Sequence, residues 1–443
     1  MTSLIQKLTR CRSWRFAIAI IGLLTSSSAL PHGGTVCADD WPQWGGPERD
    51  LVWRETGIVE KFPKKGLLPR VWSTPISEGY SGPAVANGRV FITDRLTDKN
   101  LERVFCLNAE TGEIIWKHEY PCVYEVSYPA GPRSTPVVDD GRVYTVGAMG
   151  DMFCFDEEKG DVLWQKNFRT DYGTTMPNWG MVASPLVDGD QLITLVGGPG
   201  SLVVSFDKAT GMELWRALDD PEIGYAPPVI FTVEGVRHLI IWHPKAITSL
   251  NPDNGEQRWE VPYEVKVGLS IATPRLVGNR LFVASFYNGP RMLEITSPTE
   301  AKIVWAGKSN SEDETDGLHP IMCIPWMNES HIYGVCSYGQ LRCLDAQTGT
   351  RIWETTKATG KGRWWNAFII PHEDRFFIHN EQGELIIANL TPEGYTEISR
   401  ALLVKPTRAV SRRMTIWSHP AFAMKSVFAR NDEEIVRVNL AAE

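Results

Sequence analysis

The feature that most constrains this chain is a nine-residue pattern that returns along it at a nearly constant spacing. The copy at residues 345–353 reads Asp-Ala-Gln-Thr-Gly-Thr-Arg-Ile-Trp. The short carboxylate of Asp345 can accept hydrogen bonds from backbone N–H groups two or three residues later, and Gly349 can adopt the positive φ of a tight reversal. Residues 350–353, Thr-Arg-Ile-Trp, combine polar and apolar side chains, as in a half-buried strand. Each copy therefore predicts a turn followed by a strand.

Every copy of the pattern ends in a tryptophan. The full copies end at Trp116, Trp164, Trp215, Trp259 and Trp353, and a degenerate copy ends at Trp305. Successive tryptophans are 48, 51, 44, 46 and 48 residues apart, and a period of about 40–50 residues suits a unit of four short strands. We therefore predict an all-β propeller, in which these six tryptophans are packing residues rather than a binding surface.

The two ends of the chain predict how the ring closes. Seven units begin near Tyr80, Arg133, Gly180, Tyr225, Leu269, His319 and Trp365. Three further strands follow near residues 421, 427 and 435, whereas residues 67–73, with Trp72, resemble the last strand of a unit. Because closure removes exposed strand edges, we predict an eight-bladed β-propeller of four-stranded blades, in which the N-terminal strand joins the C-terminal blade. A seven-bladed ring is the alternative.

Residues 1–38 have the pattern of a secretory signal peptide. Four basic residues precede an apolar run at 16–24, and Val36-Cys37-Ala38 offers a cleavage site with small residues. We expect cleavage after Ala38 and a periplasmic or secreted protein; a lipid-modified Cys37 is the alternative. Residues 39–66 are predicted to form an irregular arm, because they are rich in Trp, Pro and Gly, and residues 67–443 the propeller.

Charge and cysteine content narrow the possible partners. Without the leader, the chain has 41 basic and 53 acidic residues, a net charge of −12, so it lacks the basic footprint of a nucleic-acid-binding protein. No later apolar run is long enough to span a membrane. Three of the six remaining cysteines, Cys106, Cys154 and Cys343, lie two residues before the turn Asp or Asn, where a small buried side chain is expected. A disulfide between Cys336 and Cys343 is left open.

The Asp-x-x-Thr-Gly-x-x-x-Trp repeat resembles that of the PQQ-like β-propeller repeat family. Its members include quinoprotein alcohol dehydrogenases and the propeller lipoprotein of the outer-membrane β-barrel assembly machinery. Residues 41–47, Trp-Pro-Gln-Trp-Gly-Gly-Pro, look like the start of a group of exported bacterial proteins with this fold. The resemblance implies that the repeated tryptophans dock between neighbouring blades. It implies little about function, because one fold carries many different sites.

The resemblance leaves two classes of function. Family enzymes bind PQQ against an adjacent Cys-Cys pair and use an Asp base and a calcium site of Glu and Asn. No two cysteines here are adjacent, no such calcium motif can be aligned, and the acidic run at 312–317 lacks the spacing of a calcium loop. We therefore expect a non-catalytic scaffold without a cofactor, a monomer that binds a protein or another cell-envelope partner. A PQQ-dependent dehydrogenase of alcohols or sugars, with calcium, is the alternative.

The loops that enter the innermost strands should gather at one mouth of the channel. Aromatic and arginine side chains dominate binding hot spots, and loops on a rigid scaffold commonly carry function. We therefore predict that this mouth binds the partner. The residues are Tyr80, Arg133, Trp179, Tyr225, His319, Trp364, Trp365, Asn366, Trp417 and His419. Each of them could instead plug the channel or cap a blade. A metal-binding role for His319 and His419 is a minor alternative.

Overall fold

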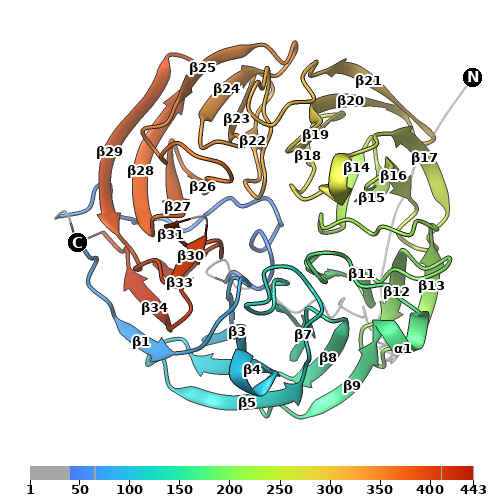
Figure 1. The fold of residues 1–443 in the computed structure, drawn as a ribbon, viewed down its shortest axis with the longest axis vertical. Coiled ribbons are helices and arrows are strands. Elements are labelled where there is room, and N and C mark those ends of the chain that lie inside the picture. The colour runs from blue at the N-terminus through green and yellow to red at the C-terminus, as the bar shows by residue number, and fades with distance from the viewer. Residues whose placement is uncertain (1–39, 64–65, 411, 443) are drawn as a thin grey trace, which may run out of the picture. The chain divides into compact units, whose positions relative to one another are not determined.

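Eight four-stranded antiparallel sheets form a closed ring (Figure 1). The structure is a computed structural model and describes residues 40–63, 66–410 and 412–442. The predicted signal peptide lies outside these residues. The eight-bladed propeller is confirmed, and the seven-bladed alternative is wrong.

The blades follow one another along the chain, each running from an inner to an outer strand. Blade one consists of β2 (Ala84–Ala86), β3 (Arg89–Leu96), β4 (Leu101–Asn108) and β5 (Ile114–Pro121). Blade two consists of β6 (Val137–Asp139), β7 (Arg142–Val146), β8 (Asp151–Asp156) and β9 (Val162–Asn167). Blade three consists of β10 (Leu186–Asp188), β11 (Gln191–Leu195), β12 (Val203–Asp207) and β13 (Glu213–Ala217). Blade four consists of β14 (Val229–Val233), β15 (Val236–His243), β16 (Ala246–Leu250) and β17 (Gln257–Pro262).

The second half of the ring repeats this order. Blade five consists of β18 (Arg275–Val277), β19 (Arg280–Ser285), β20 (Gly289–Ser297) and β21 (Glu300–Ala306). Blade six consists of β22 (Trp326–Met327), β23 (His331–Val335), β24 (Leu341–Asp345) and β25 (Arg351–Thr355). Blade seven consists of β26 (Ala367–His372), β27 (Arg375–Asn380), β28 (Glu384–Thr391) and β29 (Gly394–Leu402). Blade eight consists of β32 (Ala421–Ala423), β33 (Ser426–Arg430), β34 (Glu434–Asn439) and β1 (Trp72–Pro75).

A few short elements interrupt this pattern, and the repeat did not predict them. They are the helix α1 (Phe168–Tyr172), two 3-10 turns (Thr97–Lys99 and Lys266–Gly268) and a hairpin of β30 (Arg408–Val410) and β31 (Arg413–Thr415). Asn167 caps α1 by accepting a hydrogen bond from the backbone N–H of Thr170, and Gly173 ends the helix with a positive φ. The hairpin lies between blades seven and eight in the sequence.

The ring is closed by pairing between the two ends of the propeller. β1 pairs antiparallel with β34, with Trp72 opposite Arg437 and Pro75 opposite Glu434. The prediction that residues 67–73 form this strand is right in role and wrong in bounds. Leu67 instead forms a parallel bridge with Leu402 at the end of β29. The end of the arm therefore contacts blade seven, and the chain then continues into β1 of blade eight.

The repeated pattern builds the outer hairpin of a blade. In blade six, the Asp345 carboxylate accepts hydrogen bonds from the backbone N–H groups of Gln347 and Thr348 at 3.0 and 2.8 Å, and Gly349 has φ 73°. Next to this turn the strand pairing shifts by a β-bulge, between Cys343 and Leu344. A shift at the equivalent place occurs in each of blades one to seven. The turn and the bulge together account for the constant distance from the Asp or Asn to the tryptophan.

The tryptophan of one blade packs against the turn glycine of the next. The ring of Trp116 lies where a Cβ on Gly160 would be, at 2.5 Å, and its Nε1–H donates to the carbonyl of Glu157 at 2.9 Å. The same contact joins Trp72 to Gly112, Trp164 to Gly211, Trp215 to Gly255 and Trp305 to Gly349. The glycine is therefore needed both for its positive φ and for its missing side chain.

Small side chains opposite the tryptophans leave room for this contact. Cys106, Cys154 and Cys343 are paired across the sheet with Trp116, Trp164 and Trp353, and serines take this place in blades three and four. All six cysteines of the described residues are buried and unpaired. The disulfide between Cys336 and Cys343 is not formed, because Tyr333 rather than Cys336 is the partner of Cys343 in the sheet.

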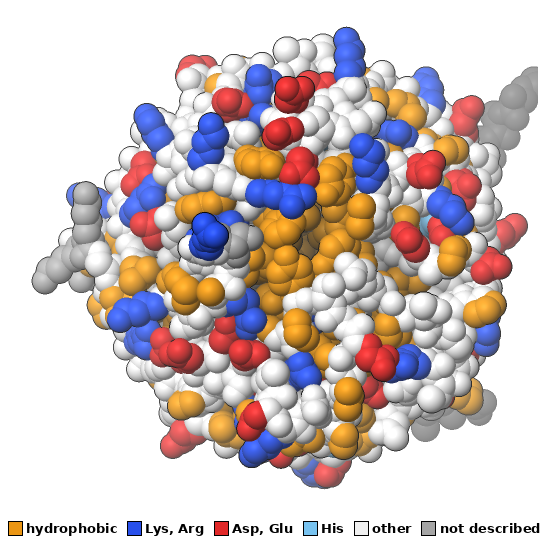
Figure 2. Space-filling view, viewed as in Figure 1, with side chains coloured by type: hydrophobic (Ala, Val, Ile, Leu, Met, Phe, Trp, Pro, Cys, Tyr) orange, Lys and Arg blue, Asp and Glu red, His pale blue; other side chains and the backbone are white. Residues whose placement is uncertain are grey.

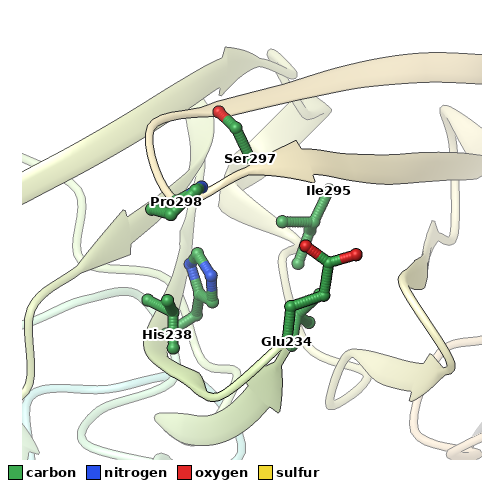
Figure 3. Close-up of a pocket in the computed structure, with 7 residues that line it drawn as sticks. Glu234, His238, Ile295, Ser297 and Pro298 are labelled. Atoms are coloured by element: carbon green, nitrogen blue, oxygen red, sulfur yellow. The ribbon is translucent and has the colours of Figure 1, made fainter.

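The tryptophan contact is incomplete between blades four and five. The outer turn of blade five reads Ser-Pro-Thr-Glu at 297–300 and has no glycine, and Nε1 of Trp259 is buried without a partner. This interface contains a crevice of about 50 Å³. Figure 3 shows His238 of β15 facing Pro298 in the turn of blade five, and Glu234 of the preceding turn beside Ile295. The degenerate repeat thus corresponds to a looser interface.

The N-terminal arm crosses the central channel, a role that its composition did not predict. Trp41 exchanges two backbone hydrogen bonds with Val85 of blade one, the Pro42 carbonyl accepts from Val138 of blade two, and Trp53 donates to Pro371 of blade seven. Figure 1 shows this blue segment running into the middle of the ring. The arm therefore connects blades that are not neighbours.

A buried arginine holds the arm in the channel. The guanidinium of Arg49 donates to the carbonyls of Pro185 at 2.9 Å, Ser184 at 3.4 Å and Pro228 at 3.2 Å, and burial lowers the pKa of Arg49 to about 9. Arg275 of blade five donates in turn to the carbonyl of Asp50 at 2.7 Å. These bonds join the arm to blades three, four and five.

The same arm replaces the tryptophan that blade seven lacks. Ser399 stands in the tryptophan position of β29, directly after the bulge. Its hydroxyl accepts a hydrogen bond from the backbone N–H of Phe62 at 3.0 Å, and Phe62 is 7% exposed. Leu68 and Leu402 are joined by a further backbone hydrogen bond. Blade seven therefore diverges from the repeat where the arm supplies the packing.

The tryptophan–glycine contact can be tested with a matched pair of substitutions. Gly160→Ala should lower the free energy of unfolding by about 3 kcal/mol, because the new Cβ displaces Trp116 in addition to straining a positive φ. Gly141→Ala is the control, because Gly141 has a similar φ of 71° and nothing within 4 Å of the added Cβ; it should cost about 1 kcal/mol. Urea denaturation measures both, and equal losses would contradict the proposed contact.

The anchoring role of Arg49 predicts that its replacement lowers the stability of the protein more than replacement of a surface arginine on the same arm. Arg49→Met should lower the free energy of unfolding by about 2–4 kcal/mol, because it leaves buried carbonyls without donors. Arg54→Met, on the same arm, should cost less than about 1 kcal/mol, because Arg54 pairs with Asp50 and Glu48 at the surface. Thermal melts of the two variants make the comparison, and a larger loss for Arg54→Met would refute it.

Candidate ligand cavity at the channel mouth

A cavity of about 350 Å³ opens where the loops enter the innermost strands. It is lined by Trp44, Tyr80, Ser127, Tyr128, Arg133, Asn178, Trp179, Val182, Ser184, Tyr225, Pro227, Val267, Leu269, Ile271, Tyr287, Ile321, Met322, Trp364, Phe368, Trp417 and His419. Nine of these side chains are aromatic. Figure 2 shows hydrophobic side chains gathered around a hollow at the centre of the ring. The volume falls in the range of small-molecule sites, about 300–1,000 Å³.

The arm provides the floor of the cavity. The Nε1–H of Trp44 donates to the hydroxyl of Thr273 at 3.1 Å. Thr273 follows the lining residues Leu269 and Ile271 in the sequence and comes just before the first strand of blade five. The Trp44 ring also makes an edge contact with His419, with 4.3 Å between the centroids. The cavity therefore ends inside the ring at the segment that crosses the channel.

Arg133 shapes the wall rather than offering a free charge. Its guanidinium donates to the carbonyls of Gly131, Ser127 and Tyr128, at 2.5, 2.9 and 2.6 Å. The guanidinium also lies over the ring of Tyr80, at 5.1 Å from the centroid, and burial lowers the pKa of Arg133. The arginine thus holds the 127–133 loop in place.

Three lining residues adopt left-handed backbone conformations that are uncommon for non-glycine residues. They are Tyr128 with φ 54°, Val267 with φ 59° and Trp364 with φ 66°. The conformation is least favourable for Val267, which is β-branched, and this side chain is 63% exposed. Strain of this kind persists only where the surrounding structure imposes it and is common at ligand clamps. Three separate loops are therefore held so that they present apolar side chains at the mouth.

The aromatic side chains on one side of the mouth contact one another. Tyr80 is stacked on Trp417 with 6.3 Å between the centroids, and Tyr128 contacts both Trp417 and Trp364 edge-on, at 5.7 and 6.3 Å. Across the cavity, Trp179 packs edge-on against Tyr225 at 5.4 Å. These geometries are favourable for aromatic pairs, so the wall is arranged before any ligand binds.

His419 is held neutral at the base. Its Nδ1 donates to the carbonyl of Pro420 at 3.3 Å, so Nε2 carries the lone pair that accepts from the Thr135 hydroxyl at 2.7 Å. Burial lowers the pKa of His419 to about 4, and the neighbouring His379 adds to the effect. At neutral pH this imidazole brings no charge to the cavity.

The structure brings seven of the ten predicted mouth residues together. Tyr80, Arg133, Trp179, Tyr225, Trp364, Trp417 and His419 line the cavity, whereas His319, Trp365 and Asn366 do not. His319 is fully buried between the carbonyl of Phe286 and the carboxylate of Asp316, and Trp365 packs on glycines 360 and 362. Neither polar atom of the buried Asn366 amide has a partner among the described residues.

Sequence reasoning missed Trp44 and Tyr287 because they come from outside the expected loops. Trp44 belongs to the arm, whereas the missed Val267 does lie in an expected loop, in a 3-10 turn between blades four and five. Tyr287 follows the second strand of blade five rather than preceding the first. The tryptophan-rich motif at 41–47 was the one signal that could have pointed to Trp44.

The lining does not fit the quinone and calcium site of the family enzymes. PQQ carries carboxylate groups and its calcium needs oxygen ligands, but the residues that line the cavity include no Asp, Glu or Cys. Arg133 is already bonded to three carbonyls. Among the residues that the structure describes, no group of three or more His, Cys, Asp or Glu side chains is placed to hold a metal. Both histidines are buried, and His419 lines the cavity whereas His319 does not.

Carboxylates of the acidic run at 312–317 form hydrogen bonds and an ion pair within their own loop and with neighbouring segments. Glu312 accepts a hydrogen bond from the hydroxyl of Tyr338 at 2.8 Å and forms an ion pair with Arg363 at 2.6 Å. The Asp316 carboxylate accepts from the backbone N–H groups of Lys308 and Gly317 at 2.6 and 2.8 Å. These carboxylates are therefore used within the protein.

Comparison with known proteins identifies the family. A family model described as outer membrane protein assembly factor BamB matches residues 103–355, more than half of the chain. The chain belongs to this PQQ-like β-propeller family. No curated protein matches the chain significantly.

Solved structures show the same fold in members with different functions. BamB from Moraxella catarrhalis is 15% identical, with a TM-score of 0.57 over 85% of this chain and 98% of that one. Quinohemoprotein alcohol dehydrogenase from Comamonas testosteroni is 13% identical, with a TM-score of 0.61 over 91% and 81%. A europium-containing methanol dehydrogenase is 13% identical, with a TM-score of 0.59 over 91% and 90%. At these identities the similarity establishes the fold alone. It does not distinguish a scaffold function from a dehydrogenase function.

The buried histidines predict that stability falls in mild acid. Burial lowers the pKa of His379 to about 4, so the unfolded state, with an ordinary histidine pKa, binds protons first as the pH falls below about 6.5. Between pH 7 and pH 5, this one group should cost about 2 kcal/mol of the free energy of unfolding. Urea denaturation at both pH values should therefore show a smaller difference in His379→Gln than in the wild type.

The comparison between variants is needed because the titration of other groups changes the free energy of unfolding in the opposite direction. Burial raises the pKa of Glu102 and of Glu381, and these carboxyls favour the folded state as the pH falls. An identical pH dependence in His379→Gln and the wild type would show that His379 titrates normally in the folded protein.

Proposed function

We propose that this protein is an exported, non-catalytic propeller scaffold that binds a cell-envelope partner through the mouth of its channel. The observation that carries the proposal is the aromatic cavity, which three strained loops and the arm form in advance. Aromatic anchors in desolvated pockets contribute most of the energy in many interfaces. The family model is described as an outer membrane assembly factor, which favours a partner in the envelope. Periplasmic or secreted localisation is part of the proposal.

The form of the ring supports a scaffold. Neighbouring blades are joined by tryptophan contacts, and the arm connects blades across the channel, so the loops are carried by a rigid body. No helix in the described part of the chain is long and apolar enough to cross a membrane. The mouth offers aromatic side chains, but its lining residues include no carboxylate or thiol that could act as a base or nucleophile.

A quinone-dependent dehydrogenase remains the second candidate, because two of the similar structures are alcohol or methanol dehydrogenases. It requires the cavity to bind an anionic quinone with calcium, against the composition of its lining. The purified protein should therefore show no saturable change in absorbance with added PQQ and Ca²⁺, and no reduction of an artificial electron acceptor by alcohols or sugars. Saturable binding of PQQ, coupled to reduction of the acceptor, would contradict the scaffold function and support a quinone-dependent dehydrogenase.

The partner surface is tested by removing three aromatic rings from the mouth. The Trp179→Ala, Trp364→Ala, Trp417→Ala variant should lose capture of the envelope proteins that the wild type retains in a pull-down, by at least about tenfold, because these rings are accessible anchors. The matched control removes three exposed apolar side chains from the outer edge of the ring, Ile114→Ala, Leu163→Ala and Met212→Ala. Circular dichroism checks that both variants fold. Capture that survives in the mouth variant and is lost in the control would overturn the assignment.

A further inference from the structure

We propose that the cavity at the mouth is a binding site for an uncharged, largely apolar small molecule that contains a ring system. The proposal specifies the ligand of the site on which the proposed function rests. It depends on four properties of that site: its volume, its aromatic lining, the prior use of the basic groups around it and the strained backbone of its rim.

The volume of the cavity favours a small molecule over a single side chain of a protein. The space of about 350 Å³ lies within the range in which most of the surface of a small ligand is buried. Trp44 closes the inner end through its bond to Thr273. A molecule that enters is therefore enclosed by loops on its sides and by the arm beneath it.

The lining favours rings. Trp179 and Tyr225 form one wall, and Tyr80, Trp417 and Tyr128 form another. Aromatic faces and edges stack favourably with a planar ligand, and the aliphatic Leu269 lies between blades four and five in the same lining. The side chains are already in contact with one another, so little ordering entropy is lost when the ligand binds.

The basic groups around the cavity are engaged, which argues against an anionic ligand. Arg133 bonds three carbonyls, Arg363 pairs with Glu312 and Arg408 pairs with Asp432. The ammonium of Lys266 lies 3.3 Å from the carbonyl of Asn310. An anion in the cavity would have to break one of these interactions or remain unpaired, and burying an unpaired charge is costly.

A cationic ligand is disfavoured by the same groups. Aromatic cages recognise quaternary ammonium groups through free ring faces. Here Arg133 and Arg408 lie over Tyr80 at 5.1 and 4.9 Å, and Arg363 lies over Trp364 at 4.5 Å. The lining also contains no carboxylate to balance a positive ligand. A neutral molecule is the remaining class, with polar contacts limited to groups such as Asn178 and Ser127 at the rim.

The closing experiment uses a neutral and an anionic probe that share one scaffold, together with a smaller aromatic cation. N-Phenyl-1-naphthylamine is neutral, and 1-anilinonaphthalene-8-sulfonate is the same molecule with a sulfonate; phenyltrimethylammonium provides the cation. The neutral probe should bind the full chain saturably with one site, enhance its own fluorescence and quench tryptophan emission. The sulfonate and the ammonium should bind at least about tenfold more weakly, because their charge would be buried unpaired. Equal or tighter binding of either charged probe would overturn the proposal.

Variants that fill the cavity locate the site. Val182→Trp and Ile321→Trp add bulk from two different loops of the lining, so one remains informative if the other fails to fold. Val123→Trp is the control, because Val123 is 64% exposed and lies outside the lining. The folded filling variant should lose neutral-probe binding at least about tenfold, and the control should keep it. Undiminished binding in a folded filling variant would refute the site.

The same variants distinguish this proposal from the proposed function. If a filling variant loses the probe and also loses partner capture, both the ligand site and the partner surface are supported. If it loses the probe and keeps the partner, the ligand site stands and the partner surface lies elsewhere. If the probe does not bind the wild type while the partner does, the small-molecule site is wrong and the scaffold function is unaffected.

Discussion

The structure depends on the contact between the tryptophan of one blade and the turn glycine of the next. The indole ring occupies the space that a side chain on the glycine would need, as for Trp116 against Gly160, and its N–H bonds a carbonyl in the same turn. One contact therefore satisfies a buried polar atom, fills the gap between two sheets and sets their spacing. Because each blade packs mainly on its two neighbours, this local contact, repeated around the ring, specifies most of the architecture.

The arm compensates where the repeated contact cannot hold the ring. Blade seven has Ser399 in place of the tryptophan, and Phe62 of the arm covers it. Earlier in the arm, Arg49 bonds carbonyls of two blades, and Trp53 bonds blade seven. A ring stabilised only by contacts between neighbours can open at its weakest interface, whereas the arm joins distant blades directly. The crevice between blades four and five, near Trp259, marks an interface where the repeated contact is incomplete.

The cavity follows from the same arrangement. The innermost strands are short and converge on the axis, so the loops that precede them meet at one mouth, and the arm closes the channel beneath them. Three loops adopt strained conformations at Tyr128, Val267 and Trp364, and Arg133 fixes one of them. The resulting pocket is aromatic, and its one charged lining residue, Arg133, is bonded to backbone carbonyls; this lining suits the neutral ligand that we propose.

The sequence by itself determined the fold, because the repeat encodes local geometry: Asp345 and Gly349 specify the turn, and the spacing to Trp353 specifies the bulge and the strand. Seven units and a composite eighth can therefore be counted along the chain, although the closing strand begins later than its pattern predicts. Only the tertiary structure decided which residues form the cavity. Loop position could not show that Trp365 packs away from it, nor place Trp44, because an irregular arm has no periodicity. Repeats determine what neighbouring residues do, whereas the site depends on contacts between residues far apart in the chain, which no local pattern records.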